Sequence, residues 1–182
     1  MLGFGCVMTR DRIIRLVALV AVLVCTAGCD QATKRLARRE LSQRGSVTLP
    51  GSFVQLRLAE NPGAFLSLGA SLPQAARSAL TIGAGLGLAV LLAYLVRAPR
   101  LRWSLLFGLA LVWAGGTSNL IDRFARHGEV TDFMVVRVGP LHTGVFNFAD
   151  FAIVAGVLIA IASVRAAARK LESHLAENGT RR

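Results

Sequence analysis

The sequence has few charged residues, and acidic residues are the rarer kind. Asp, Glu, Lys and Arg make up 17% of its 182 residues, whereas an ordinary soluble domain is about one quarter charged. Hydrophobic residues make up 54%, and the mean hydropathy is +0.56. This composition excludes an ordinary water-soluble domain. The length is that of a single domain, which we expect to cover residues 1–182.

Cysteine and histidine are also scarce, with three residues of each. All three cysteines lie within the first 29 residues, so we expect no outer disulfide framework and no cysteine nucleophile beside a histidine base. His127, His142 and His174 lack the spacing of metal ligands. Ser118 has no nucleophile elbow around it. We therefore expect no metal and no cofactor, which leaves carboxylate chemistry.

Four apolar stretches predict a membrane protein. They cover residues 16–29, 78–96, 103–121 and 143–164. Three have about the 20 residues that a helix needs to cross a bilayer, and the first does if Ile13 and Ile14 belong to it and Arg15 reaches the interface. The first stretch has an alternative interpretation as a signal peptide of a chain that is itself a lipoprotein, cut before Cys29. Such a cut would remove one helix and leave three spans.

Basic residues explain the formal charge of +11. They cluster at residues 10–15, 97–102 and 165–182, and the positive-inside rule predicts that all three clusters are cytoplasmic. Both termini would then be cytoplasmic, with residues 165–182 as a basic tail. Residues 1–9 are interpreted as an extension or, alternatively, as a start-site error with Met8 as the true start. A nucleic-acid partner is not expected, because no basic stripe is interleaved with aromatic residues.

The outer loops contain strand-like segments. Residues 54–58 alternate between apolar and polar, and residues 133–138 are β-branched and apolar before Gly139 and Pro140, as in short strands that end at turns. Residues 31–43 are charged and compatible with a helix at the membrane interface. The predicted fold class is integral membrane α-helical, with four transmembrane helices, a small outer sheet and an interfacial helix.

Four of the ten acidic residues converge on the predicted outer face. They are Asp30, Asp122, Asp132 and Asp150. Asp150 lies about seven residues into the fourth span, roughly 10 Å at 1.5 Å per residue, and an ionisable residue inside a span indicates a functional site. The alternative is that Asp150 caps a helix that begins at Phe151. Asn147, three residues before Asp150, favours a polar cavity.

Further polar residues accompany the acids. They are Lys34, Asn61, Gly63, Asn119, Arg123 and Asn147. Asn119, Asp122 and Arg123 share one helix face, either as a structural cluster in which Arg123 pairs with Asp122 or as neighbours of a site. Asp30 and Lys34 are spaced as in a common exposed interfacial ion pair. The Asn-Pro-Gly segment predicts a turn.

Paired carboxylates suit one kind of chemistry. Two carboxylic acids a few Å apart do not both ionise readily, so one keeps a proton while the other acts as a base. Such a pair activates water and protonates a leaving amine, the two tasks of peptide hydrolysis. The residues leave open which two acids pair, with Asp150 the first choice. An ion pathway in a transporter or channel is the alternative, although the acids gather at one face and no internal repeat is evident.

Five motifs follow one another between Asp30 and Asp150. They are Asp-Gln-Ala-Thr-Lys at 30–34, Asn-Pro-Gly-Ala-Phe at 61–65, Asn-Leu-Ile-Asp-Arg at 119–123, Val-Thr-Asp-Phe at 130–133 and Phe-Asn-Phe-Ala-Asp at 146–150. Together they resemble the lipoprotein signal peptidases, the type II signal peptidases of bacteria. Ser118 departs from the family pattern, which more often has glycine there.

The resemblance implies a membrane aspartyl endopeptidase that cuts prolipoproteins before the diacylglyceryl-modified cysteine of the lipobox. It implies that Asp132 and Asp150 are catalytic. The supporting or substrate-binding positions would be Asp30, Lys34, Asn61, Gly63, Asn119, Asp122, Arg123 and Asn147. Four transmembrane helices with an outer β-cradle are implied as well. The expected partners are lipid-modified prolipoproteins and membrane lipid, and we expect a monomer in the bacterial cytoplasmic (inner) membrane, with its active site at the outer face.

Overall fold

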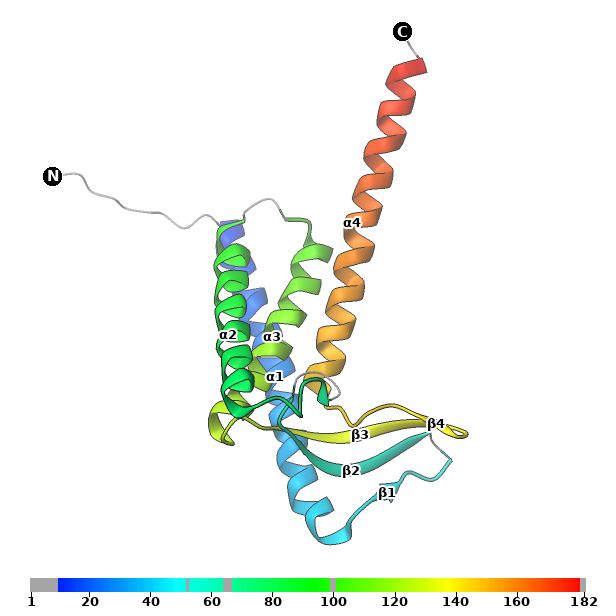
Figure 1. The fold of residues 1–182 in the computed structure, drawn as a ribbon. Helices are drawn as coiled ribbons and strands as arrows, with labels where there is room; N and C mark the ends of the chain where they lie inside the picture. The colour runs from blue at the N-terminus through cyan, green and yellow to red at the C-terminus, as the bar shows by residue number, and fades with distance from the viewer. Residues whose placement is uncertain (1–9, 52, 64–66, 99–100, 181–182) are drawn as a thin grey trace, which may run out of the picture.

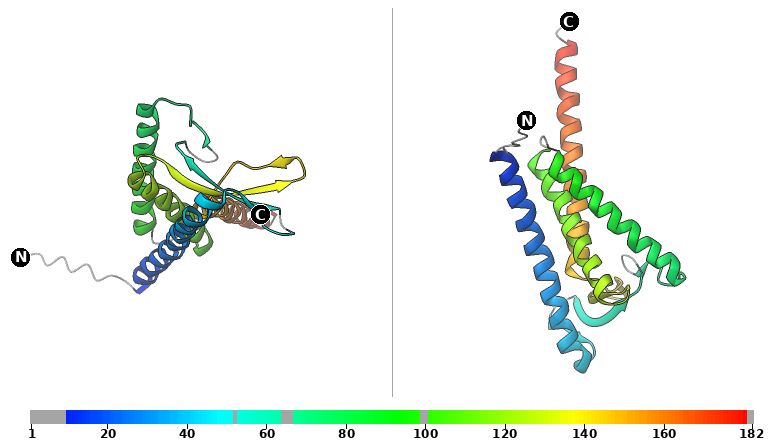
Figure 2. Two further views of the ribbon diagram at one scale, coloured as in Figure 1. Left: turned by 90° about the horizontal axis from the view of Figure 1, so that it is seen from below. Right: turned by 90° about the vertical axis from the view of Figure 1, so that its left-hand side faces the viewer.

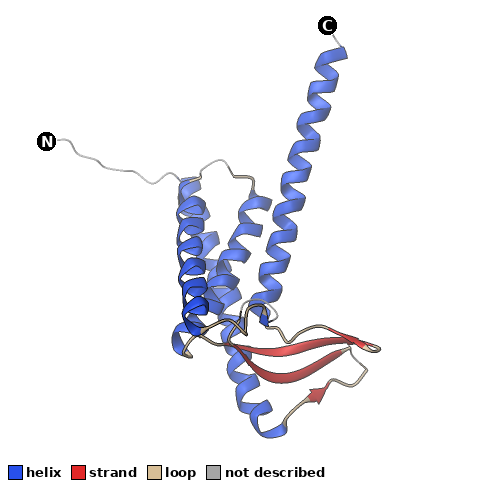
Figure 3. Cartoon of the chain, in the orientation of Figure 1, coloured by secondary structure: helices blue, strands red, loops and turns tan. Residues whose placement is uncertain are grey.

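The computed structural model contains four long helices and one small antiparallel sheet (Figure 1, Figure 3). It describes residues 10–51, 53–63, 67–98 and 101–180, so the predicted extension at residues 1–9 lies outside the described residues. The helices are α1 (Arg10–Arg44), α2 (Gln74–Arg97), α3 (Trp103–Ala125) and α4 (Phe148–Thr180). The strands are β1 (Val47–Thr48), β2 (Val54–Asn61), β3 (Val130–Val138) and β4 (Leu141–His142), in that order across the sheet.

The helices form a bundle with the sheet at one end. All four are long and apolar enough to cross a membrane, which confirms the four predicted spans. The start of α1, the end of α2, the start of α3 and the end of α4 lie at the end of the bundle away from the sheet (Figure 1). The axis of α2 is tilted relative to those of α1 and α4 and diverges from them at the end of the bundle that carries the sheet (Figure 2).

The helix expected at residues 31–43 is the last part of α1 and not a separate element. α1 has 35 residues, about 52 Å at 1.5 Å per residue, which exceeds the ~30 Å hydrocarbon core. Its outer part packs Ala37 and Leu41 against Phe133 of β3, with Leu56 and Leu58 of β2 alongside. This packing fixes the sheet to the bundle, and no proline interrupts residues 10–44.

Small residues bring α3 and α4 into backbone contact. A Cβ atom added to Gly108 would lie 2.7 Å from the carbonyl oxygen of Gly156, and one added to Gly115 would lie 2.5 Å from that of Ala149. Such positions allow membrane helices to approach closely. The close approach holds the first turn of α4 against the outer half of α3.

The fourth span begins later than predicted. Residues 143–146 belong to the sheet region, where Phe146 and Met134 exchange backbone hydrogen bonds of 2.9 Å in both directions. α4 begins only at Phe148, so Asp150 lies in its first turn. The predicted depth of seven residues is therefore wrong, and the alternative that Asp150 caps the helix is closer, with a start at Phe148 instead of Phe151. Hydropathy does not distinguish an apolar strand from the helix that follows it.

Candidate active site

Asn147 links the carboxylates of Asp132 and Asp150. Its side-chain Nδ2 donates to Asp132 Oδ1 at 2.7 Å, and its backbone N–H donates to Asp150 Oδ2 at 3.1 Å. Asn147 is fully buried, while Asp132 and Asp150 are 1% and 5% exposed. The two carboxylates that the resemblance pairs thus share one hydrogen-bonding neighbour.

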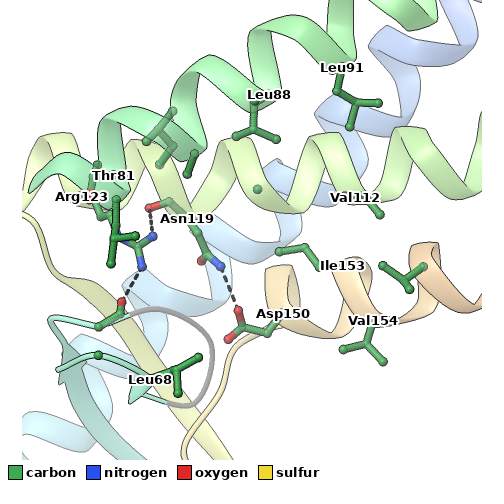
Figure 4. Close-up of a pocket in the computed structure, with 18 of the residues that line it drawn as sticks. Leu68, Thr81, Leu88, Leu91, Val112, Asn119, Arg123, Asp150, Ile153 and Val154 are labelled. Atoms are coloured by element: carbon green, nitrogen blue, oxygen red, sulfur yellow. Dashed lines mark hydrogen bonds between the residues drawn. The ribbon is translucent and has the colours of Figure 1, made fainter. Parts of the chain in front are cut away.

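Local helix chemistry determines where Asp150 lies. Asn147 precedes α4, and its Oδ1 accepts the backbone N–H of Asp150 at 2.9 Å, while Asp150 accepts the backbone N–H of Asn147. This reciprocal pattern is a capping box, which satisfies N–H groups at a helix start. The second oxygen of Asp150 accepts from Asn119 Nδ2 of α3 at 2.9 Å (Figure 4). Asp150 is therefore both a capping residue and a part of the site.

Asp132 is held from the other side by Asn61. Asn61 Nδ2 donates to Asp132 Oδ2 at 2.8 Å, and Asn61 Oδ1 accepts the backbone N–H of Gly63 at 2.9 Å. The side chain of Asn61 therefore closes the predicted turn and brings the loop after β2 to the carboxylate. Asp132 itself lies on β3, paired with Ala59 of β2.

Burial is the main influence on the acidity of Asp132. The pKa of Asp132 is raised from the ordinary 3.8 to about 7, chiefly because the carboxylate is buried. The hydrogen bond from Asn61 acts in the opposite direction and lowers this pKa. The charge of Asp150 raises the pKa further, and the hydrogen bond from Asn147 and the charge of Lys34 lower it. Near neutral pH, Asp132 can therefore either hold or release a proton.

Lys34 of α1 is the centre of a second buried cluster beside the pair. Its Nζ lies 2.6 Å from Asp30 Oδ2 and 3.0 Å from Asp122 Oδ2, and it donates to Asn119 Oδ1 at 2.9 Å. These three partners match the three hydrogens of the ammonium group. Lys34 and Asp30 are fully buried, so the expectation of an exposed interfacial pair is wrong. Its partners on α3 are distant in sequence, and the spacing within α1 gives no sign of them.

Each acid of this cluster holds the backbone next to one member of the pair. Asp30 Oδ1 accepts the N–H of Ala149, the residue before Asp150, at 2.9 Å. Asp122 Oδ2 accepts the N–H of Thr131, the residue before Asp132, at 3.2 Å. Lys34 thus connects the positions of β3 and α4 through two carboxylates, and Asp30 lies at the positive end of the α4 dipole.

Arg123 has different partners from the one expected. Its Nη2 donates to the backbone oxygen of Gly63 at 2.6 Å and its Nη1 to that of Asn119 at 3.3 Å (Figure 4), while Asp122 forms its ion pair with Lys34. Arg123 therefore ties the loop after β2 to α3. The predicted cluster of residues 119–123 exists, but its acid pairs with Lys34, which also donates to Asn119.

Three further residues of the site were not among the predicted site residues. Gln31 Nε2 donates to Asp122 Oδ1 at 3.0 Å, and the Ser118 hydroxyl donates to Asp30 Oδ2 at 2.7 Å. Thr131 receives a hydrogen bond of 2.8 Å from Arg38 of α1. Each lies next to or inside a recognised motif, which is the one signal that could have identified them.

A pocket of about 630 Å³ lies beside Asp150, between α2, α3 and α4. Its walls are mostly apolar. Asn119, Arg123 and Asp150 lie at one end, and Leu91 and Val112 lie farther along it (Figure 4). Among the described residues, no three His, Cys, Asp or Glu side chains are grouped as a metal site requires.

The fold and site define a multi-pass membrane protein with a buried pair of aspartates at one end of an apolar pocket. Comparison with known families identifies it more closely. The model of the signal peptidase II family matches residues 20–165, and the chain belongs to this family. The predicted family and enzyme class, a protease, are thereby confirmed.

Individual relatives agree with this membership. A lipoprotein signal peptidase of Leifsonia xyli is 37% identical over 80% of this chain, and the match spans 66% of the relative. One of Moorella thermoacetica is 38% identical over 78% of this chain and 87% of its own length. A solved bacterial membrane enzyme has a TM-score of 0.68 at 21% identity, covering 81% of this chain and 92% of that chain. This structural likeness supports the four-helix fold with its outer sheet.

Proposed function

We propose that this chain is an aspartyl endopeptidase that removes signal peptides from prolipoproteins by cutting before a diacylglyceryl-modified cysteine. The observation that carries the proposal is that Asn147 bonds both Asp132 and Asp150, beside an apolar pocket. The names of the relatives, lipoprotein signal peptidases, support the substrate class.

The pair would hydrolyse the peptide by general acid–base catalysis. With one proton shared between Asp132 and Asp150, the ionised carboxylate takes a proton from water as the water oxygen attacks the scissile carbonyl. The protonated partner donates its proton to the carbonyl oxygen, giving a tetrahedral diol. The C–N bond then breaks as the amine receives a proton from the first aspartate and a diol hydroxyl returns its proton to the second. The pKa of about 7 for Asp132 suits this exchange near neutral pH.

The neighbouring residues would position the pair. Asn61 and Asn119 each donate to the oxygen that Asn147 leaves free on one carboxylate, which orients both groups. Asp30, Lys34 and Asp122 hold the backbone beside the pair, and Arg123 and Gly63 shape the loop at the mouth of the pocket. The apolar walls suit a lipid chain and an apolar signal-peptide segment.

Orientation in the membrane follows from the basic residues. Arginines occur at the start of α1, at the end of α2 and in the later part of α4. These parts of the helices lie at the end of the bundle away from the sheet (Figure 1). By the positive-inside rule this end is cytoplasmic. The site then faces the outer side of a bacterial cytoplasmic membrane, and we expect the chain to act as a monomer.

A cleavage assay tests this function. The purified chain in lipid bicelles is given a prolipoprotein carrying the diacylglyceryl cysteine, and the products are measured by mass spectrometry. One cut before the modified cysteine is expected. A cut elsewhere, or an intact substrate with correctly folded protein, would contradict the proposal. The unmodified prolipoprotein serves as the control and should be cut far more slowly.

A further inference from the structure

Arg77 is a basic residue in the wall of an otherwise apolar pocket. It lies in the first turn of α2, and it lines the pocket together with Leu80, Ala84 and Leu88 of the same helix. Of the described residues that line this pocket, three are charged, namely Arg77, Arg123 and Asp150. Arg77 is the one whose role the site described above does not explain.

The hydrogen-bonding state of Arg77 indicates a missing acceptor. Its Nε atom is buried and, among the described residues, has no hydrogen-bond partner. Arg123 and Asp150, by contrast, are bonded to protein groups. A buried N–H without an acceptor is costly. Arg77 as a whole is half-buried, so its unsatisfied Nε–H lies in the pocket wall while a bound molecule can still reach the guanidinium.

The shape of the pocket indicates which molecule would bring the acceptor. Arg77 and Leu91 both line it, and they are fourteen residues apart on α2, about 21 Å at 1.5 Å per residue. One leaflet of the hydrocarbon core is about 15 Å thick. The pocket is therefore long enough for an acyl chain, with Arg77 at the end near the sheet and Asp150. In a lipid, the groups at that end of the chain are the ester oxygens.

We propose that Arg77 is a specificity-determining residue that donates hydrogen bonds to the ester carbonyl oxygens of the diacylglyceryl group on the substrate cysteine. This inference rests on the proposed function. The planar fork of arginine donates in parallel to two neighbouring oxygens, and two ester carbonyls a few bonds from the cysteine sulfur present such a pair. Ester binding at Arg77 would hold the modified cysteine beside Asp150 while the acyl chains fill the apolar part of the pocket.

Two matched substrates test the inference. One prolipoprotein carries its two chains through esters, and the other carries the same chains through ethers, which lack the carbonyl oxygens. The wild type should prefer the ester by about tenfold or more in kcat/KM, the effect of losing a hydrogen bond to a charged group. The preference should lie mainly in KM. In Arg77→Met it should fall to about one, and Arg77→Lys should restore only part of it. Arg57→Met, at an exposed position on β2, is the control and should keep the full preference.

The outcomes are distinguishable. An ester preference that persists in Arg77→Met would overturn the role of Arg77 and leave the proposed function intact. The same holds if the wild type cuts both substrates equally well, or if Arg77→Met changes only the response to added anionic phospholipid, which would point to a lipid phosphate. Failure of the wild type to cut either substrate would overturn the proposed function together with this inference. Equal unfolding midpoints for the arginine variants show that folding does not cause the difference.

Discussion

Replacing Lys34 tests how the site is held together. Lys34→Met keeps most of the side-chain volume and removes the charge that Asp30 and Asp122 share at 2.6 and 3.0 Å. Both acids are almost completely buried, and removing one partner of a buried ion pair costs about 3–5 kcal/mol. Domains are stable by about 5–15 kcal/mol, so this loss should leave the protein marginally folded.

The assay measures unfolding in a mild detergent, monitored by circular dichroism as the temperature or the denaturant concentration is raised. Lys34→Met should lose roughly 3–5 kcal/mol, and adding Asp122→Asn should recover part of it, because one uncompensated charge is removed. Lys170→Met is the matched control, since Lys170 is exposed on α4, and its stability should stay close to that of the wild type. A loss below about 1 kcal/mol for Lys34→Met would refute the view that a buried ion cluster positions β3 and α4.

Two other predictions concern Asp132 and the packing of α4. Because the pKa of Asp132 is about 7 in the folded chain against an ordinary 3.8, the folded state binds the proton more tightly and its free energy of unfolding should fall as pH rises between these values. One pKa unit corresponds to about 1.4 kcal/mol, so over this pH range the free energy of unfolding in detergent should fall by roughly 4 kcal/mol more for the wild type than for Asp132→Asn. If the stabilities of the two proteins depended on pH in the same way, the raised pKa would be contradicted. Gly115→Ala places a Cβ 2.5 Å from the Ala149 oxygen, so its free energy of unfolding should fall by about 1–3 kcal/mol and its cleavage should be slower. Gly83→Ala is the control, because its Cβ meets nothing within 4 Å, and its stability should be unchanged or slightly higher. Equal stability of the two variants would argue against close α3–α4 packing.

Much of the fold could be predicted because it depends on local patterns. Hydropathy locates the membrane helices, alternation locates β2, and a β-branched apolar run locates β3. The start of α4 was predicted too early because the residues before it are apolar as well, although Phe146 among them pairs with Met134 of β3 and the helix cap is Asn147.

Burial and partners were harder to predict because they depend on contacts between distant segments. The spacing of Asp30 and Lys34 describes an exposed pair equally well, and only the approach of α3, which brings Asp122, makes it a buried cluster. The position of Arg77 in a pocket cannot be predicted from the sequence for the same reason, because the pocket is formed by three helices.

The most direct test of the central claim is the rate of prolipoprotein cleavage by Asp132→Asn and Asp150→Asn under single-turnover conditions. Acid–base groups contribute about 10²–10⁴-fold to a rate, so each variant should lose at least a hundredfold while still inserting into the membrane and unfolding cooperatively. Asp11→Asn, at an exposed position in the first turn of α1, should cleave at the wild-type rate. Near-normal cleavage by either Asp132→Asn or Asp150→Asn would contradict the assignment of these two residues as the catalytic pair.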